Sequence, residues 1–393
     1  MWNRSHSRLI PLVSAISFLL GIEAGGFQLV LTDIAGEFAL NNTKMGSVVM
    51  AEYMAIILFP LIFGGISDKI GKKKVLTFFI PFLIIGCAII TFSYHEIGLY
   101  LGIFMIGAGY AISEAIGAAA LSDSDVVNSE KNQTFTQAFY CLGAVIGPLI
   151  VDRLMRTGLN WRIGFILVGI GFAALFIFLL HTPFVRGDRP DANHTTSKSI
   201  APIPLKGTKK FPFLYGAFIL LIASAVIYCG IENGVSYFAD SFFISEMNSP
   251  KLSVYAISLF WLAMGTSRFI FGIIKTDAVK VVMILYAISC ILLLLLSRID
   301  TPSWALILFI AMGFACGPTC PMLMGMATKR FSEHSGSVVS ILMSGLGLGG
   351  AISPLFMGLV ADHFGFRWSF GILATFALIG FLLSFTFLRK ANL

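Results

Sequence analysis

The sequence predicts an all-α integral membrane protein with twelve transmembrane helices, arranged as two six-helix bundles with pseudo-two-fold symmetry. Of its 393 residues, 57% are hydrophobic and only 12% are charged, whereas about a quarter of the residues of a soluble protein are charged. Because one crossing takes roughly 20 apolar residues, a chain of this length has room for about a dozen crossings. An internal repeat then divides the crossings into two equal sets.

Hydrophobic runs between charged and turn-forming residues define the predicted spans. They lie near residues 9–31, 46–66, 75–94, 98–121, 135–155, 162–182, 212–238, 252–274, 279–297, 303–327, 336–360 and 368–388. A long polar interval follows the sixth span. We therefore predict an N-terminal six-helix bundle at 1–182, a linker at 183–211 and a C-terminal six-helix bundle at 212–393. The first apolar run is too long for the core of a signal peptide and is predicted to be a retained helix.

Basic residues are distributed unevenly between the two predicted faces of the membrane. Nineteen Lys and Arg residues fall on the face that holds both termini and the linker, seven on the opposite face, and one, Arg268, within a span. Cytoplasmic loops carry the excess of positive charge, so both termini and the linker are predicted to be cytoplasmic. Orientation thus accounts for the formal charge of +7, and no nucleic-acid partner is expected.

The two predicted halves repeat one another in sequence. GIEAGGF at residues 21–27 recurs as GIENGVS at 230–236, and GAVIGPL at 143–149 recurs as GGAISPL at 349–355. Trp161 and Arg162 follow GAVIGPL in the sequence, and Arg367 and Trp368 follow GGAISPL. Since each half has an even number of crossings, both halves are expected to have the same topology.

The loop between the second and third predicted spans reads GGISDKIGKKKVL, residues 64–76. This segment resembles the loop signature of the major facilitator superfamily, a superfamily of secondary transporters. The signature positions are filled by Gly64, Asp68, Lys69, Gly71, Lys72 and Lys73. The resemblance implies a cytoplasmic gate, in which an acid at a helix end caps a helix or pairs with basic groups across the bundle interface. The alternative is a solvated basic loop that serves orientation only.

Three further segments resemble the fucose-permease-like sugar transporters within that superfamily. They are YCGIENGVSYFADSFF at 228–243, SLFWLAMGTSRFIFG at 258–272 and GPTCPMLMGMATKRFSEHSG at 317–336. The chain departs from the pattern at Ser267, where a glycine is expected before Arg268. The resemblance implies a sugar as the solute, with an amino acid or a nucleoside as alternatives.

Carboxyl groups inside predicted spans are the strongest candidates for function, because an ionisable group at the bilayer centre is costly. Glu114 lies among small residues in AGYAISEAIGAA and is predicted to be the proton or substrate carboxylate; the resemblance assigns this role to a glutamate of the fourth helix. Glu23 and Glu232 occupy equivalent positions in the repeat. They are either further proton or substrate sites that face one another across a cavity, or hydrogen-bonded braces. Glu52 is predicted to be an interhelical partner.

Other polar residues within the spans are candidates for the solute cavity or for its gates. Arg268 either pairs with a carboxylate as a gate or extends to the interface. Asp33, Glu37 and Asp240 are predicted to be solvated near the outer mouth. The residues predicted to hydrogen-bond or stack on a neutral polar solute are Gln28, Tyr228, Asn233, Tyr237 and Trp261.

These features predict a secondary transporter that moves a small polar solute by alternating access and proton symport. The six histidines lie at span ends or in loops, so neither an enzyme nor a metal or cofactor site is expected. The alternative is proton-coupled efflux of an amphiphilic compound, because Gly147-Pro148 resembles a signature of drug and proton antiporters. The predicted partners are the solute, protons and the lipid bilayer of a cell inner membrane, with the chain as a monomer.

Overall fold

The computed structural model describes residues 6–124, 129–182, 211–274, 276–330 and 335–391. Within these ranges the chain forms fourteen α-helices and no strand. Twelve segments are long and apolar enough to cross a membrane. This confirms the predicted fold class. The predicted linker lies outside the described residues except for Phe211, so the predicted domain limits stay predictions.

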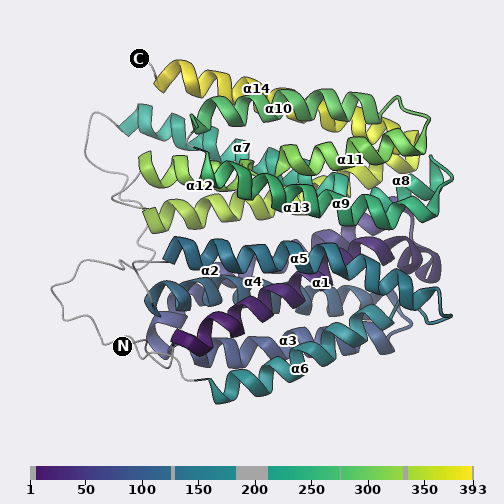
Figure 1. Cartoon of the computed structure of the whole chain (residues 1–393), viewed down its shortest axis with the longest axis vertical. Helices are drawn as coiled ribbons and strands as arrows, with labels where there is room; N and C mark the ends of the chain where they lie inside the picture. Colours follow the sequence, from purple (N-terminus) through teal and green to yellow (C-terminus); the bar gives the residue numbers. More distant parts are fainter. Residues whose placement is uncertain (1–5, 125–128, 183–210, 275, 331–334, 392–393) are drawn as a thin grey trace. The chain divides into compact units, whose positions relative to one another are not determined.

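The chain separates into two compact units, the first of which comprises residues 1–38 and 51–199. It contains most of the first six helices, which are α1 (His6–Phe38), α2 (Asn42–Ile70), α3 (Lys72–Phe92), α4 (Glu96–Ser124), α5 (Ser129–Met155) and α6 (Ile163–His181). Helix α1 packs along α5, and α3 packs against both α4 and α6 (Figure 1).

The second unit comprises residues 39–50 and 200–393. Its helices are α7 (Phe211–Tyr237), α8 (Ala239–Ser245), α9 (Pro250–Ile273), α10 (Ala278–Leu296), α11 (Pro302–Cys316), α12 (Thr319–Arg330), α13 (Ser335–Phe364) and α14 (Phe366–Ala391). Helix α7 packs along α13, and α10 packs against α11 and α14. The packing of the first unit therefore recurs in the second, as the repeat in the sequence predicts.

Glycines bring the paired helices of each unit into close contact. A Cβ atom at Gly21 of α1 would overlap the main-chain oxygen of Tyr140 on α5. In the second unit, a Cβ atom at Gly349 of α13 would overlap the main-chain oxygen of Val226 on α7. The residues that carry the repeat are thus the ones that allow the backbones of these helices to approach.

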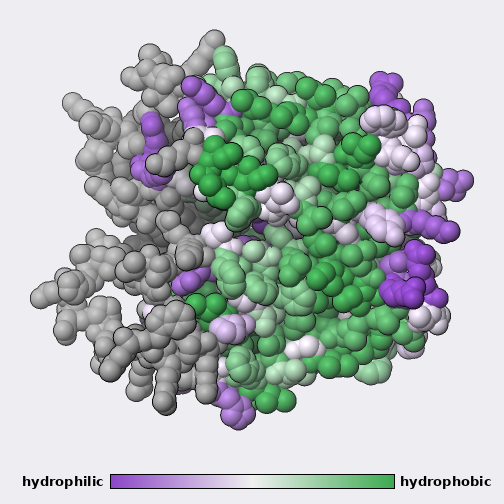
Figure 2. Space-filling view, in the orientation of Figure 1, coloured by the Kyte–Doolittle hydropathy of each residue, from purple (hydrophilic) through white to green (hydrophobic). Residues whose placement is uncertain are grey.

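Hydrophobic side chains cover the middle of the helices on the face shown in Figure 2, and hydrophilic residues gather at helix ends. Apolar residues that a soluble protein would bury are exposed here; Ile97, for example, is 82% exposed and Phe92 78%. In a membrane, lipid covers such surfaces, so exposure of these side chains carries no penalty. This distribution agrees with the twelve predicted crossings.

The start of α2 belongs to the second unit rather than the first. Asp362, near the end of α13, accepts hydrogen bonds from the main-chain N–H groups of Asn42 and Thr43, each at 2.9 Å. A carboxylate in this position satisfies amides that the first turn of a helix cannot pair. Helix α2 is therefore capped by a residue 320 positions away in the sequence.

Candidate functional site

Glu114 lies on α4 and is half-buried within the first unit. Its Oε1 atom accepts a hydrogen bond from Nε2 of Gln137 on α5 at 2.8 Å. Tyr110, one turn earlier on α4, is flanked by Glu114, by Tyr140 of α5 and by Tyr53 of α2. The rings of Tyr110 and Tyr140 meet edge to face, with centroids 6.2 Å apart. We call these five residues the Glu114 cluster.

Glycines on α4 lie in close contact with neighbouring helices. A Cβ atom at Gly107 would overlap the main-chain oxygen of Glu52 on α2. A Cβ atom at Gly109 would lie 2.6 Å from Leu83 on α3. These glycines therefore allow α4 to pack closely against its neighbours, which fixes the position of the Glu114 cluster.

Glu23 on α1 and Glu52 on α2 are both 2% exposed. Neither carboxyl oxygen of Glu23 has a hydrogen-bond partner among the described residues. Glu52 acts electrostatically on Glu23, and Glu23 acts on Cys87 of α3. Glu23 is therefore within electrostatic range of groups on α2 and α3 of its own unit.

Glu232 on α7, the counterpart of Glu23 in the repeat, has different surroundings. It interacts electrostatically with Arg268 of α9 and lies beside Tyr228, one turn earlier on α7. The Nε atom of Arg268 donates to the main-chain oxygen of Gly317, at the end of α11, at 3.0 Å. Arg268 therefore donates to a main-chain oxygen at the break between α11 and α12, which falls at Gly317-Pro318. The prediction that Glu23 and Glu232 face one another across a cavity stays a prediction.

The residues predicted to line a solute cavity are all buried. The exposed fraction is 1% for Gln28, 2% for Tyr237, 3% for Tyr228, 4% for Trp261 and 6% for Asn233. The amide of Asn233 donates to the main-chain oxygen of Cys229 on its own helix at 2.8 Å, and the Trp261 ring packs edge to face on Phe260. Their role in binding stays a prediction.

The predicted gate motif spans the end of α2 and the start of α3. Gly71 has a φ of 98°, a conformation that favours glycine. Lys72 Nζ donates to the main-chain oxygen of Ala119 at 3.1 Å, and Lys73 Nζ donates to that of Leu180 at 2.8 Å. Lysines so placed satisfy main-chain oxygens close to the ends of α4 and α6. Gly64 and Lys69 lie in α2, and the side chain of Asp68 lies outside the described part.

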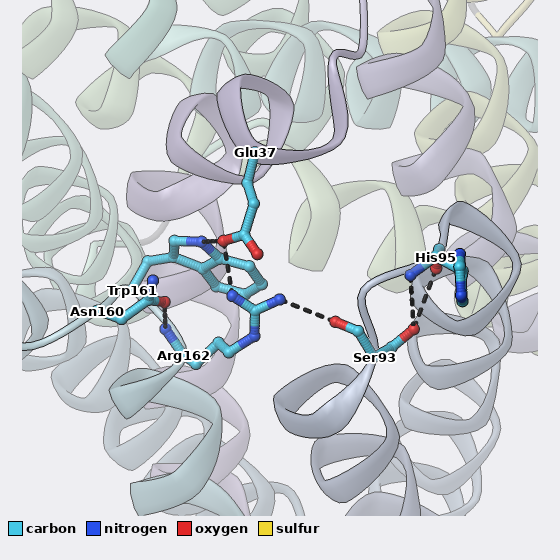
Figure 3. A network of polar contacts seen from close by, with 6 residues as sticks. All are labelled: Glu37, Ser93, His95, Asn160, Trp161 and Arg162. Atoms are coloured by element: carbon cyan, nitrogen blue, oxygen red, sulfur yellow. Dashed lines mark hydrogen bonds and ion pairs between the residues drawn. The ribbon is translucent and has the colours of Figure 1, made fainter.

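A polar network that was not predicted joins α1, α3 and the start of α6 (Figure 3). Glu37 Oε2 accepts from Arg162 Nη1 at 2.6 Å and from the Trp161 indole at 2.7 Å. Arg162 Nη2 also donates to the main-chain oxygen of Ser93 at 2.8 Å. We call Glu37, Ser93 and Arg162 the first clamp. The local signal was present, because Trp161 and Arg162 already belonged to the repeat.

The second unit contains an equivalent network. Arg367 Nε lies 3.3 Å from Glu246 Oε2, and Arg367 Nη2 lies 2.7 Å from Asp300 Oδ1. We call these three residues the second clamp. Asp240, predicted to be solvated, is 4% exposed in α8; that prediction is wrong, because α8 turns this residue into the unit.

Comparison with known proteins identifies the family. The sequence model of the Major Facilitator Superfamily matches residues 13–280 and 275–392. The chain belongs to this superfamily. It is a secondary transporter, and the family and the relatives described below are transporters rather than enzymes.

Relatives of this superfamily member have different substrates in their names. The chain is 24% identical to a glucose/galactose transporter of Brucella abortus, over 94% of the chain and 91% of the relative. It is 25% identical to the multidrug efflux protein YfmO of Bacillus subtilis, over 90% and 87%. The solved structure of the nucleoside transporter NupG matches 97% of the chain and 99% of its own length, with a TM-score of 0.78 at 15% identity. The last likeness concerns the fold alone.

Proposed function

We propose that this transporter takes up a small polar solute, with a sugar as the favoured class and an amino acid or nucleoside as alternatives. The Glu114–Gln137 hydrogen bond within the Glu114 cluster is the observation that carries the proposal. A carboxylate, an amide and phenol groups together offer both donors and acceptors to a solute rich in hydroxyl groups. The tyrosine rings add flat apolar faces on which a sugar ring can stack.

Protons drive the uptake in this proposal. Glu114 is the first candidate for the coupling or substrate carboxylate, and Glu23 and Glu232 are further candidates. Each lies within a membrane-crossing segment, where an ionised group is costly and a neutral one much less so. Taking up a proton on one side and releasing it on the other would couple the solute to the proton gradient as access alternates.

Several other features fit this proposal. Arg268, beside Glu232, can respond to a change of charge on that carboxyl group. The gate motif, with Lys72 and Lys73 at the start of α3, supports gating at the cytoplasmic side, given the orientation that positive charges predict. We propose a monomer in the inner membrane with both termini in the cytoplasm. The named bacterial relatives agree with this location.

Uptake into proteoliposomes tests the proposal. A panel of radiolabelled sugars, amino acids and nucleosides is offered under an imposed inward proton gradient, to the wild type and to Glu114→Gln. We expect accumulation of a panel member, with a sugar favoured, and roughly a tenfold or greater loss in Glu114→Gln, because a hydrogen-bonded charged group contributes about 1.5–3 kcal/mol.

Glu96→Gln is the matched control, because Glu96 is the first residue of the same helix and the chemical change is the same. It should transport like the wild type. Absence of gradient-driven uptake for every panel member would contradict the proposal.

The alternative function is proton-coupled export of an amphiphilic compound. It is favoured by the likeness to an efflux protein, which is 25% identical to the chain, while the sugar transporter is 24% identical. Everted vesicles that accumulate a fluorescent lipophilic cation on energisation, alongside failure of the uptake panel, would support export.

A further inference from the structure

Two buried glutamates of the first unit interact electrostatically with one another. Glu23 and Glu52 come from α1 and α2 and are equally buried, at 2% exposure. Helix α2 is held in place here by close contact of the Glu52 backbone with Gly107 of α4. Glu114, by contrast, is turned to Gln137 on α5.

Among the described residues, the charged group that acts on Glu23 is the Glu52 carboxyl group. Gly21 and Gly25 of α1 contact α5, and Glu23, two residues from each, therefore lies on the opposite side of the helix. From α6, the contacts to this stretch of α1 are apolar, through Gly171 on Leu19. The Glu52 carboxyl group acts on Glu23, and Glu23 in turn acts on the Cys87 thiol of α3.

Glu23 is also without hydrogen bonds. Both of its carboxyl oxygens are buried and have no partner in the part of the chain that the structure describes. Buried polar atoms in native proteins nearly always have a partner, so a carboxyl group without one is a candidate for function. Two like charges that interact in a buried interior are unfavourable, and one added proton removes the repulsion.

We propose that Glu23 and Glu52 form a proton-binding pair that holds one proton inside the first unit, with Glu23 as the protonated member. The pair does not include Glu114, which keeps its role as the coupling or substrate carboxylate of the proposed function. The inference rests on the proposed function, because that function makes the proton the coupling ion. Sodium is not the favoured occupant, because the pair offers no further oxygen ligands among the groups that act on Glu23.

Infrared spectroscopy of the purified full-length protein tests the inference without any solute. Protonated and ionised carboxyl groups have separate bands, and their amplitudes are followed through a pH series. We expect a protonated band in the wild type, and loss of the amplitude of one carboxyl group in Glu23→Gln. In Glu52→Gln the band should remain but titrate with a changed midpoint, because coupled carboxyl groups titrate as a pair. Glu96→Gln should change neither property.

Three results would overturn the inference. They are an unchanged band in Glu23→Gln, an unmoved midpoint in Glu52→Gln, and displacement of the wild-type proton by sodium ions at constant pH. If Glu23→Gln does not fold, the wild type and Glu52→Gln still decide the question. The outcome is independent of the uptake assay. A pair that titrates as expected without gradient-driven uptake would contradict only the proposed function, and uptake without a titrating pair would contradict only this inference.

Discussion

At the scale of single residues, the two clamps show that the repeated sequence forms the same glutamate–arginine pair in each unit, with a different third partner. Both use a glutamate, at the end of α1 in the first unit and directly after α8 in the second, and an arginine at the start of the last helix of the unit. The third partner is the main-chain oxygen of Ser93 in one unit and the Asp300 carboxylate in the other. The first arginine is also better shielded, since its side chain is 10% exposed and that of the second is 28% exposed.

We expect Arg162→Lys to lower the free energy of unfolding by about 2–3 kcal/mol, because lysine cannot reproduce the two-pronged geometry of a partly buried arginine. Arg367→Lys should cost less, because water screens the second clamp more strongly. SDS denaturation in mixed micelles measures both. Arg156→Lys is the control: its ion pair with Asp152 is exposed, so the change should stay within about 0.5 kcal/mol. Equal effects of Arg162→Lys and Arg156→Lys would contradict the expectation.

At the scale of helices, the sequence predicts existence and order better than length or contact. The first span was predicted to end near residue 31, yet α1 continues to Phe38. The charge of Glu37 is met by Arg162, 125 residues away, and local hydropathy contains no information on such a partner. The break at Gly317-Pro318 was predictable because its cause is local. Short α8 follows from packing and was missed.

The same distinction applies to the Glu114 cluster. A carboxylate in the fourth span could be predicted from its cost in the bilayer, but its partner Gln137 could not. The partner depends on how α4 and α5 are placed by glycine contacts with other helices. Similarly, the burial of Glu23 and the lack of a hydrogen-bond partner for its carboxyl oxygens among the described residues are revealed only by the packed unit.

Helix contacts through glycine lead to a prediction for both units. Gly21→Ala and Gly349→Ala each place a methyl group on a main-chain oxygen of the partner helix, so each should destabilise the protein by about 1–3 kcal/mol. Gly36→Ala is the control on the same helix as Gly21, because its added methyl group meets nothing within 4 Å. It should be neutral or stabilising, since alanine favours helix by up to about 1 kcal/mol. SDS denaturation measures the free energy of unfolding of each variant. An unchanged free energy in Gly21→Ala would contradict the close contact between α1 and α5.

At the scale of the whole molecule, α2 is the element that joins the two units by an unbroken helix. Residues 42–50 belong to the second unit and the remainder to the first. Within the second unit, the cap on Asp362 ties the start of α2 to α13.

We therefore expect Asp362→Ala to remove hydrogen-exchange protection from the amides of Asn42 and Thr43, with a loss of about 0.5–2 kcal/mol as for other helix caps. Asp277→Ala is the matched control. Asp277 caps its own helix by accepting from Val279 and Lys280, so its loss should affect only the first turn of α10. Unchanged exchange at Asn42 and Thr43 in Asp362→Ala would show that the cap does not hold α2.

The position of Asp362 also has a consequence for biosynthesis. The chain is made from its N-terminus, and the cap closes a contact across 320 residues. When α2 leaves the ribosome, its capping carboxylate has not yet been translated, and the first-turn amides must be satisfied by water or lipid head groups in the interval. The second helix to be made is thus among the last to gain all of its hydrogen bonds. In a nascent chain truncated before α13, the first-turn amides of α2 would lack their capping carboxylate.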